Sequence, residues 1–84
     1  MFSRTSAATV LQTLEYGEIK KENPDSLVLY QVGDFFEAYG ADAQTVSEAL
    51  ELNLTSRFIG SNQRTQMCGF PANRLETYIN MLLD

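Results

Sequence analysis

The segment GDFFEAYG, residues 33–40, brings three aromatic side chains and two carboxylates together in one short stretch. Residues two apart on a β-strand share a face, so Phe35, Glu37 and Tyr39 are predicted to point the same way. An apolar ring presented beside a hydrogen-bond acceptor is the chemistry that a wedge inserted between stacked bases requires.

The opposite face of this strand is predicted to be the buried one. Phe36 and Ala38 make a satisfactory core pair, which leaves Phe35 and Glu37 side by side on the face that is more exposed to solvent. A purely structural interpretation of Phe35 stays open, in which its ring only fills the core.

Gly33 and Asp34 precede the strand and are typical turn residues. They would set the bend of the strand, with Asp34 accepting local backbone hydrogen bonds. Asp34 and Glu37 could also be the acids of a metal-dependent nuclease. However, an offset of three along an extended strand sends the two carboxylates to opposite faces, so they cannot share a metal without a bulge. No metal site is predicted.

The composition argues against an enzyme. The chain contains no histidine, which removes the commonest general base and the commonest metal ligand. Its single cysteine, Cys68, cannot form an internal disulfide and is expected to be a small buried hydrophobe on a strand. We expect no catalytic residues in this chain.

The length and hydropathy indicate one domain over residues 1–84, of which 44% are hydrophobic and 20% charged. No apolar run reaches the ~18 residues of a membrane span, and no secretory signal is recognisable, so a cytoplasmic location is expected. The last helix reaches the end of the sequence without a Gly or Pro stop, which suggests a fragment of a longer chain.

Hydrophobic periodicity predicts three helices and four strands. The helices are expected over residues 6–22, 42–51 and from Pro71 onward, the strands over residues 27–32, 35–39, 53–58 and 67–70, and a mobile hairpin-like loop over residues 59–66. The run at 27–32 is apolar on both faces, which is typical of a central strand covered on both sides. The fold class is therefore α+β with mixed α/β layers: a small mixed β-sheet of about four strands flanked by about three helices.

Two helices are predicted to present one apolar face each. The expected inner residues are Ala43, Val46, Ala49 and Leu50 in the second helix, and Leu75, Tyr78, Ile79 and Leu82 in the third.

The charges are distributed unevenly along the chain. The formal net charge is −5, which argues against tight nonspecific binding to nucleic acid, because Lys and Arg supply that affinity. Yet between residues 52 and 75 the only charged residues are Arg57, Arg64 and Arg74. A polyanion could therefore approach this half of the domain.

Four segments, "EIKKENPD", "LVLYQVGDFFEAYG", "LNLTSR" and "MCGFPANRLETYI", resemble in order and spacing the N-terminal mismatch-recognition domain, domain I, of the MutS family of DNA mismatch repair proteins. The resemblance runs from about Leu14 to the C-terminus. It implies a Phe-x-Glu motif that recognises the mismatch, called the reader below, in which Phe35 inserts and stacks at a mispaired or unpaired base. Glu37 would accept a hydrogen bond from the displaced base. The middle position of the motif, usually Tyr in the family, is Phe36 here, which fits an inward role.

The resemblance also implies the partners. The strand that includes Arg57 would lie near the DNA backbone, which makes Arg57 the first candidate for a phosphate contact and Arg64 the second. The expected ligand is double-stranded DNA with mismatches or small loops. ATP and Mg would bind elsewhere in a full-length protein, dimerisation would need regions absent from this sequence, and this fragment would carry recognition without a cofactor or catalysis.

A second interpretation stays open beside the first. A domain of this ancestry could be built into a large multi-domain protein, such as one of a mobile element, and could serve DNA docking or protein contacts without repair. The acidic composition and the missing Pro-Met-Met lead of the family favour this alternative.

Overall fold

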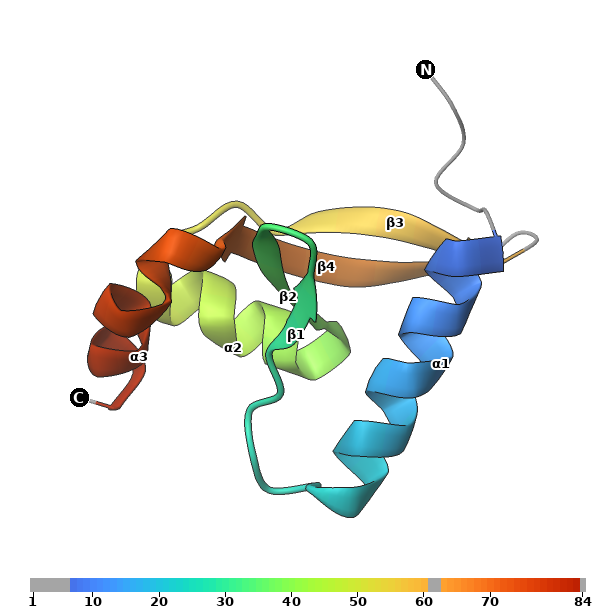
Figure 1. Ribbon diagram of the computed structural model, residues 1–84, viewed down its shortest axis with the longest axis horizontal. Helices are drawn as coiled ribbons and strands as arrows, with labels where there is room; N and C mark the ends of the chain where they lie inside the picture. Colours follow the sequence, from blue (N-terminus) through green and yellow to red (C-terminus); the bar gives the residue numbers. More distant parts are fainter. Residues whose placement is uncertain (1–6, 61–62, 84) are drawn as a thin grey trace.

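The computed structural model describes residues 7–60 and 63–83. The elements in chain order are α1 (Ala7–Glu22), β1 (Tyr30–Val32), β2 (Phe35–Tyr39), α2 (Gly40–Leu50), β3 (Thr55–Gly60), β4 (Gln63–Pro71), the 3₁₀ helix η1 (Ala72–Arg74) and α3 (Leu75–Leu83) (Figure 1). The predicted α+β class is confirmed. Among the described helices, none combines the length and apolar character that a membrane span needs.

The four strands form one sheet in the order β1-β2-β4-β3, and each neighbouring pair is antiparallel. β2 and β4 lie at the centre and pair from Phe35 opposite Pro71 to Tyr39 opposite Met67. β1 and β2 are joined by the two-residue turn Gly33-Asp34, in which Gly33 has φ +58°. This left-handed conformation is one that glycine adopts without a steric cost, so the predicted turn is confirmed.

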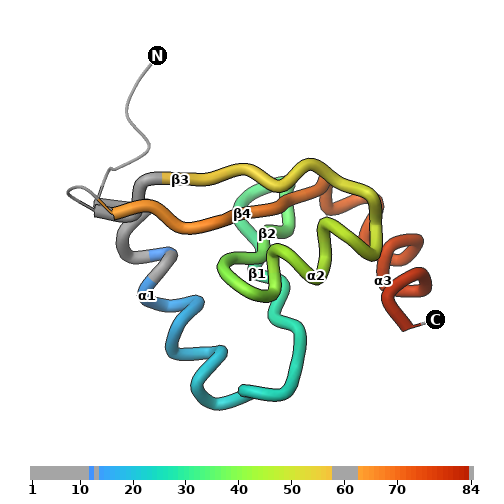
Figure 2. The backbone as a smooth tube through the Cα atoms, turned by 180° about the vertical axis from the view of Figure 1, so that it is seen from behind, coloured from blue at the N-terminus to red at the C-terminus, as the bar shows by residue number. Residues whose placement is uncertain are grey.

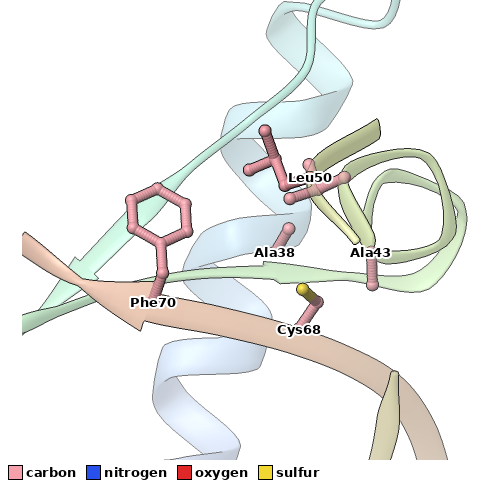
Figure 3. Packing of buried hydrophobic residues seen from close by; sticks show 6 residues of the cluster. Ala38, Ala43, Leu50, Cys68 and Phe70 are labelled. Atoms are coloured by element: carbon pink, nitrogen blue, oxygen red, sulfur yellow. The ribbon is translucent and has the colours of Figure 1, made fainter. Parts of the chain in front are cut away.

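The main core lies between the sheet and the helices α2 and α3. Its buried residues are Ala38, Ala43, Val46, Leu50, Cys68 and Phe70 (Figure 3). Phe36 packs against this cluster, with its ring centre 6.0 Å from that of Phe70. The inward roles predicted for Phe36, Ala38 and Cys68 are therefore confirmed.

The helix faces differ from the prediction at two positions. In α2 the buried stripe includes Ser47, whereas Ala49 is exposed, because Ala49 lies to the side of the row formed by residues 43, 46, 47 and 50. In α3, the residues Leu75, Tyr78 and Leu82 pack against the core, but Ile79 is exposed.

A second, smaller cluster lies on the other face of the sheet, beneath α1. Tyr16 of α1 packs there with Val28, Tyr39 and Met67. Figures 1 and 2 show α1 and α3 at opposite ends of the molecule, so α1 covers only one end of this face. The remainder of the face is available for the site described below.

The strand predicted over residues 27–32 is shorter than expected and lies at the edge of the sheet. Its first half does not join the sheet because side chains satisfy the backbone there. The Val28 N–H donates to Asp42 Oδ2 at 3.0 Å, and the Val28 carbonyl accepts from the Tyr16 hydroxyl at 2.7 Å. Val28 therefore needs no neighbouring strand to complete its hydrogen bonds.

The loop predicted over residues 59–66 is also wrong in large part. β3 continues to Gly60 and β4 begins at Gln63, with Phe58 opposite Arg64 and Ser56 opposite Gln66. Residues 61 and 62, like Ser6 at the expected start of the first helix, lie outside the described residues. Backbone pairing holds this hairpin without an apolar alternation, which explains why periodicity did not reveal it. At the other end of β4, Pro71 closes the strand, and α3 begins only at Leu75.

Candidate functional site

An open groove of about 420 Å³ crosses the face of the sheet opposite α2 and α3. All four strands contribute to it. The lining residues are Val32, Phe35, Glu37, Asn53, Thr55, Arg57, Met67 and Gly69. The structure thus brings together three of the site residues expected from the sequence, namely Phe35, Glu37 and Arg57.

Phe35 stands at the edge of this groove with 46% of its surface exposed. On its other side lies a second hollow, lined by Asp34, Phe35, Pro71, Ala72 and Asn73. The ring therefore projects between two depressions and does not fill the core. An exposed ring of this size is available to stack on another flat surface.

Glu37 lies beside Phe35 but is only 6% exposed, against the expectation that it faces water. Three donors surround its carboxylate. The Tyr39 hydroxyl donates to Oε1 at 2.5 Å, Arg57 Nη1 donates to Oε1 at 3.2 Å, and Arg57 Nη2 donates to Oε2 at 3.3 Å. A buried carboxylate is tolerated when it is paired and hydrogen-bonded in this way.

Strand order explains how Glu37 and Arg57 meet. Glu37 is on β2 and Arg57 is on β3, with β4 between them. The residue of β4 that pairs with Glu37 is Gly69, and a Cβ atom there would lie 3.2 Å from the Phe36 carbonyl and 3.5 Å from Glu37 Cγ. The absence of a side chain at Gly69 leaves room for the ion pair above the central strand.

Arg57, the first candidate for a phosphate contact, is committed to Glu37 in this structure and has a side chain only 18% exposed. Arg64, the second candidate, lies on β4 and donates to Ser56 Oγ from Nε at 3.2 Å and from Nη2 at 3.0 Å. Arg64 does not belong to the described lining of the groove. The phosphate contacts of both arginines stay predictions.

The turn residues support the strand as expected, although in a different manner. Asp34 is exposed, and it is the backbone carbonyl of Asp34 that accepts a hydrogen bond, from the Ala72 N–H at 2.6 Å. This bond ties the β1–β2 turn to the start of η1. Asp34 is exposed in the turn whereas Glu37 is buried, and among the described residues no group of three or more His, Cys, Asp or Glu side chains could hold a metal ion.

Tyr39 connects the site to the cluster beneath α1. Its ring meets that of Tyr16 edge-on, with centres 5.0 Å apart. Burial raises the pKa of the Tyr39 phenol above its ordinary value, and the hydrogen bond to Glu37 raises it further. Burial likewise raises the pKa of Tyr16, with a smaller contribution from Asp42.

These two tyrosines should make the domain sensitive to alkali. Because their folded pKa values exceed the unfolded value of about 10, the stability that they contribute is complete below pH 10 and is lost as the pH rises further. We expect the free energy of unfolding to fall by at most about 1.4 kcal/mol per pH unit for each tyrosine. Urea denaturation between pH 8 and 11 measures this slope.

Tyr16→Phe and Tyr39→Phe are the matched controls, and each should flatten the slope whatever its effect at pH 8. Appearance of tyrosinate absorbance from both rings near pH 10 in the folded domain would contradict this prediction.

Comparison with known proteins identifies the family of the chain. The sequence profile of the family described as MutS domain I matches residues 12–84. The chain belongs to this family. The resemblance to MutS domain I that the sequence analysis found is confirmed by this match.

Individual relatives agree with the family match. The DNA mismatch repair protein MutS of Syntrophobacter fumaroxidans is 48% identical over 70 residues, and that of Alkaliphilus metalliredigens is 44% identical over 70 residues. The MutS of Flavobacterium johnsoniae is 42% identical over 69 residues. The alignments cover 82–83% of this chain but only 8% of each relative. This MutS domain I chain thus spans a small part of the length of those proteins.

Two residues of the site were not anticipated as functional. The strand period places Tyr39 on the same face as Glu37, but it does not predict that the Tyr39 hydroxyl donates to the Glu37 carboxylate. The sequence predicts for Gly69 only a place in the strand over residues 67–70. A glycine inside a strand often marks a close approach by a neighbouring group, and this was the available signal.

Proposed function

We propose that this MutS domain I chain recognises mispaired or unpaired bases in double-stranded DNA as a module of a mismatch repair protein. The names of its relatives support a role in repair. The observation that carries the proposal is the half-exposed Phe35 ring at the edge of a groove that also contains Glu37. In this proposal Phe35 is the wedge of a Phe-x-Glu motif.

The wedge selects its target through the cost of deforming DNA. Insertion of a ring between base pairs requires unstacking, which costs a few kcal/mol in sound duplex and less where pairing is already defective. A mismatch therefore accepts the Phe35 ring more readily than a matched pair does. The Gly33-Asp34 turn and its bond to η1 fix the start of the strand from which Phe35 projects.

Glu37 would accept a hydrogen bond from the displaced base. A free carboxylate near phosphates is repelled by about 1 kcal/mol at 4 Å in water, and by more in a drier site. Because Arg57 lies against Glu37 and compensates its charge, we expect the discrimination to arise mainly from the hydrogen bond to the base and less from repulsion of sound duplex.

The proposed role is recognition without catalysis. ATP and Mg, dimerisation and the clamping of DNA belong in this proposal to other parts of a longer chain, and the expected location is cytoplasmic. The isolated domain should bind weakly, roughly in the 10⁻⁴ to 10⁻⁶ M range of nonspecific DNA binding, and more weakly as salt rises.

Replacement of Phe35 by alanine is expected to remove the preference for a mismatch. Two labelled duplexes, identical except for one G·T mismatch, are titrated at low salt into the wild-type domain and into Phe35→Ala, with chemical shifts as the readout. The wild type should favour the mismatch, and the variant should lose about 1–3 kcal/mol of that binding, the value of stacking one base on an aromatic ring.

Leu27→Ala is the control, because Leu27 is also a large exposed hydrophobic residue but lies outside the groove. It should leave the preference unchanged. Equal and weak binding of both duplexes by the wild type would contradict the proposal, and would favour a docking module of the same ancestry.

A further inference from the structure

The carboxylate of Glu37 has little hydrogen-bonding capacity left. Its two oxygens offer about four acceptor sites. Oε1 accepts from the Tyr39 hydroxyl and from Arg57 Nη1, while Oε2 accepts from Arg57 Nη2. Both acceptor sites of Oε1 are therefore occupied, and Oε2 has one acceptor site open.

We propose that Arg57 is a positioning residue that holds Glu37 with a single acceptor site, on Oε2, open to a donor entering the groove. This inference rests on the proposed function, in which the donor is a base N–H. Arg57 would then set specificity through Glu37 instead of serving mainly as a phosphate contact.

The geometry favours positioning for two reasons. Two N–H groups of one planar guanidinium reach the two different oxygens of Glu37, which fixes the rotation of the carboxylate as well as its place. The pair is also largely buried, with side chains 18% and 8% exposed, so water competes little for these bonds. A phosphate contact alone would need neither the two-oxygen arrangement nor the burial.

The two roles of Arg57 predict different consequences of Arg57→Lys. Lysine keeps the positive charge and can still meet a phosphate, but it cannot reproduce the planar two-pronged contact. Loss of a phosphate contact weakens binding to matched and mismatched duplex alike and reduces the salt dependence. Loss of positioning lowers the ratio of mismatched to matched affinity and leaves matched binding nearly unchanged.

The test compares wild type, Arg57→Lys, Glu37→Gln and the double variant on the matched and the G·T duplex at two salt concentrations. We expect Arg57→Lys to lower the ratio about tenfold, the effect of losing a charge-assisted hydrogen bond. The salt slope should not change. The double variant should be no worse than Glu37→Gln, because Arg57 acts through Glu37.

Arg74→Lys is the matched control. Arg74 is an exposed arginine of η1 that stacks over the Tyr78 ring at 5.3 Å, away from the groove, and its replacement should leave the ratio unchanged. A second readout needs no DNA: the carboxyl ¹³C resonance of Glu37 should shift in Arg57→Lys and stay in place in Arg74→Lys. If Arg57→Lys does not fold, Arg57→Gln replaces it, because one side-chain amide donor remains.

The outcomes separate this inference from the proposed function. A wild type that does not distinguish the duplexes overturns the proposed function and the inference together. A wild type that does distinguish them, with Arg57→Lys retaining the ratio, or weakening both duplexes equally with a reduced salt slope, overturns the inference alone.

Discussion

Asp42→Ala is expected to lower the free energy of unfolding by about 2–4 kcal/mol, although Asp42 lies outside the groove. Asp42 is 7% exposed, and its carboxylate accepts from the Val28 N–H at Oδ2 and from Lys20 Nζ at Oδ1, each at 3.0 Å. The Tyr16 hydroxyl lies 3.1 Å from Oδ2 and 2.7 Å from the Val28 carbonyl, so its single proton is shared between these two acceptors. Alanine would leave the buried Val28 N–H without an acceptor and would remove the α2 side chain that meets both α1 and the segment before β1.

Urea denaturation measures the effect, and two further variants interpret it. Asp42→Asn keeps an oxygen for Val28 but loses the charge opposite Lys20, whose side chain is about one-third exposed, so it should cost less than alanine. Glu48→Ala removes an exposed acid from the same helix and should have little effect. Equal midpoints for Asp42→Ala and Glu48→Ala would contradict the prediction.

The same network shows where sequence patterns fail for the fold. Apolar residues on both faces of 27–32 predict burial, which is correct for Val28, whereas Leu27 and Gln31 are exposed. The pattern cannot show that a tyrosine hydroxyl from α1 and a carboxylate from α2 complete the backbone hydrogen bonds of Val28. Side chains distant in sequence thus replaced a strand pairing, and only the tertiary structure reveals such a replacement.

The candidate site was predictable to a similar extent. A period of two along β2 placed Phe36 and Ala38 inward and left Phe35 outside, because strand geometry is local. The burial of Glu37 was not predictable in that way. It depends on α1 covering Tyr39, on the glycine opposite Glu37, and on a strand order that brings Arg57 within reach across β4. None of these three conditions is encoded within residues 33–40.

Phe35 and Glu37, the two residues of the proposed Phe-x-Glu motif, differ in how firmly the fold holds them. The apolar element, Phe35, is exposed and can move into DNA without disturbing the core, whereas the polar element, Glu37, is fixed within the sheet by two neighbours. A rigid acceptor distinguishes donors by their position better than a mobile one does, because no rotamer freedom is left to adapt. In the proposed reader, insertion and selectivity would thus belong to two residues on one face of β2, Phe35 and Glu37, with opposite degrees of burial.

Phe70→Ala is expected to have the largest effect on stability, a loss of about 3–5 kcal/mol. Phe70 is 2% exposed and is among the largest fully buried side chains. Its ring meets Tyr78 of α3 edge-on at 4.9 Å and lies 6.0 Å from Phe36. Alanine would leave a cavity between α3 and the sheet and would remove the contacts of the ring with Tyr78 and Phe36. A chain of 84 residues has a total stability of only about 4–13 kcal/mol, so much of it would be lost.

Phe35→Ala is the matched comparison for Phe70→Ala. It removes the same phenyl ring, but from β2, the central strand next to β4. Because the Phe35 ring is nearly half exposed on the opposite face of the sheet, Phe35→Ala should lower the free energy of unfolding by less than about 1 kcal/mol. The same replacement should remove the preference for mismatched DNA. Thermal or urea unfolding of both variants measures the difference. A stability loss in Phe35→Ala as large as that in Phe70→Ala would assign Phe35 to the core and would leave the groove without its wedge.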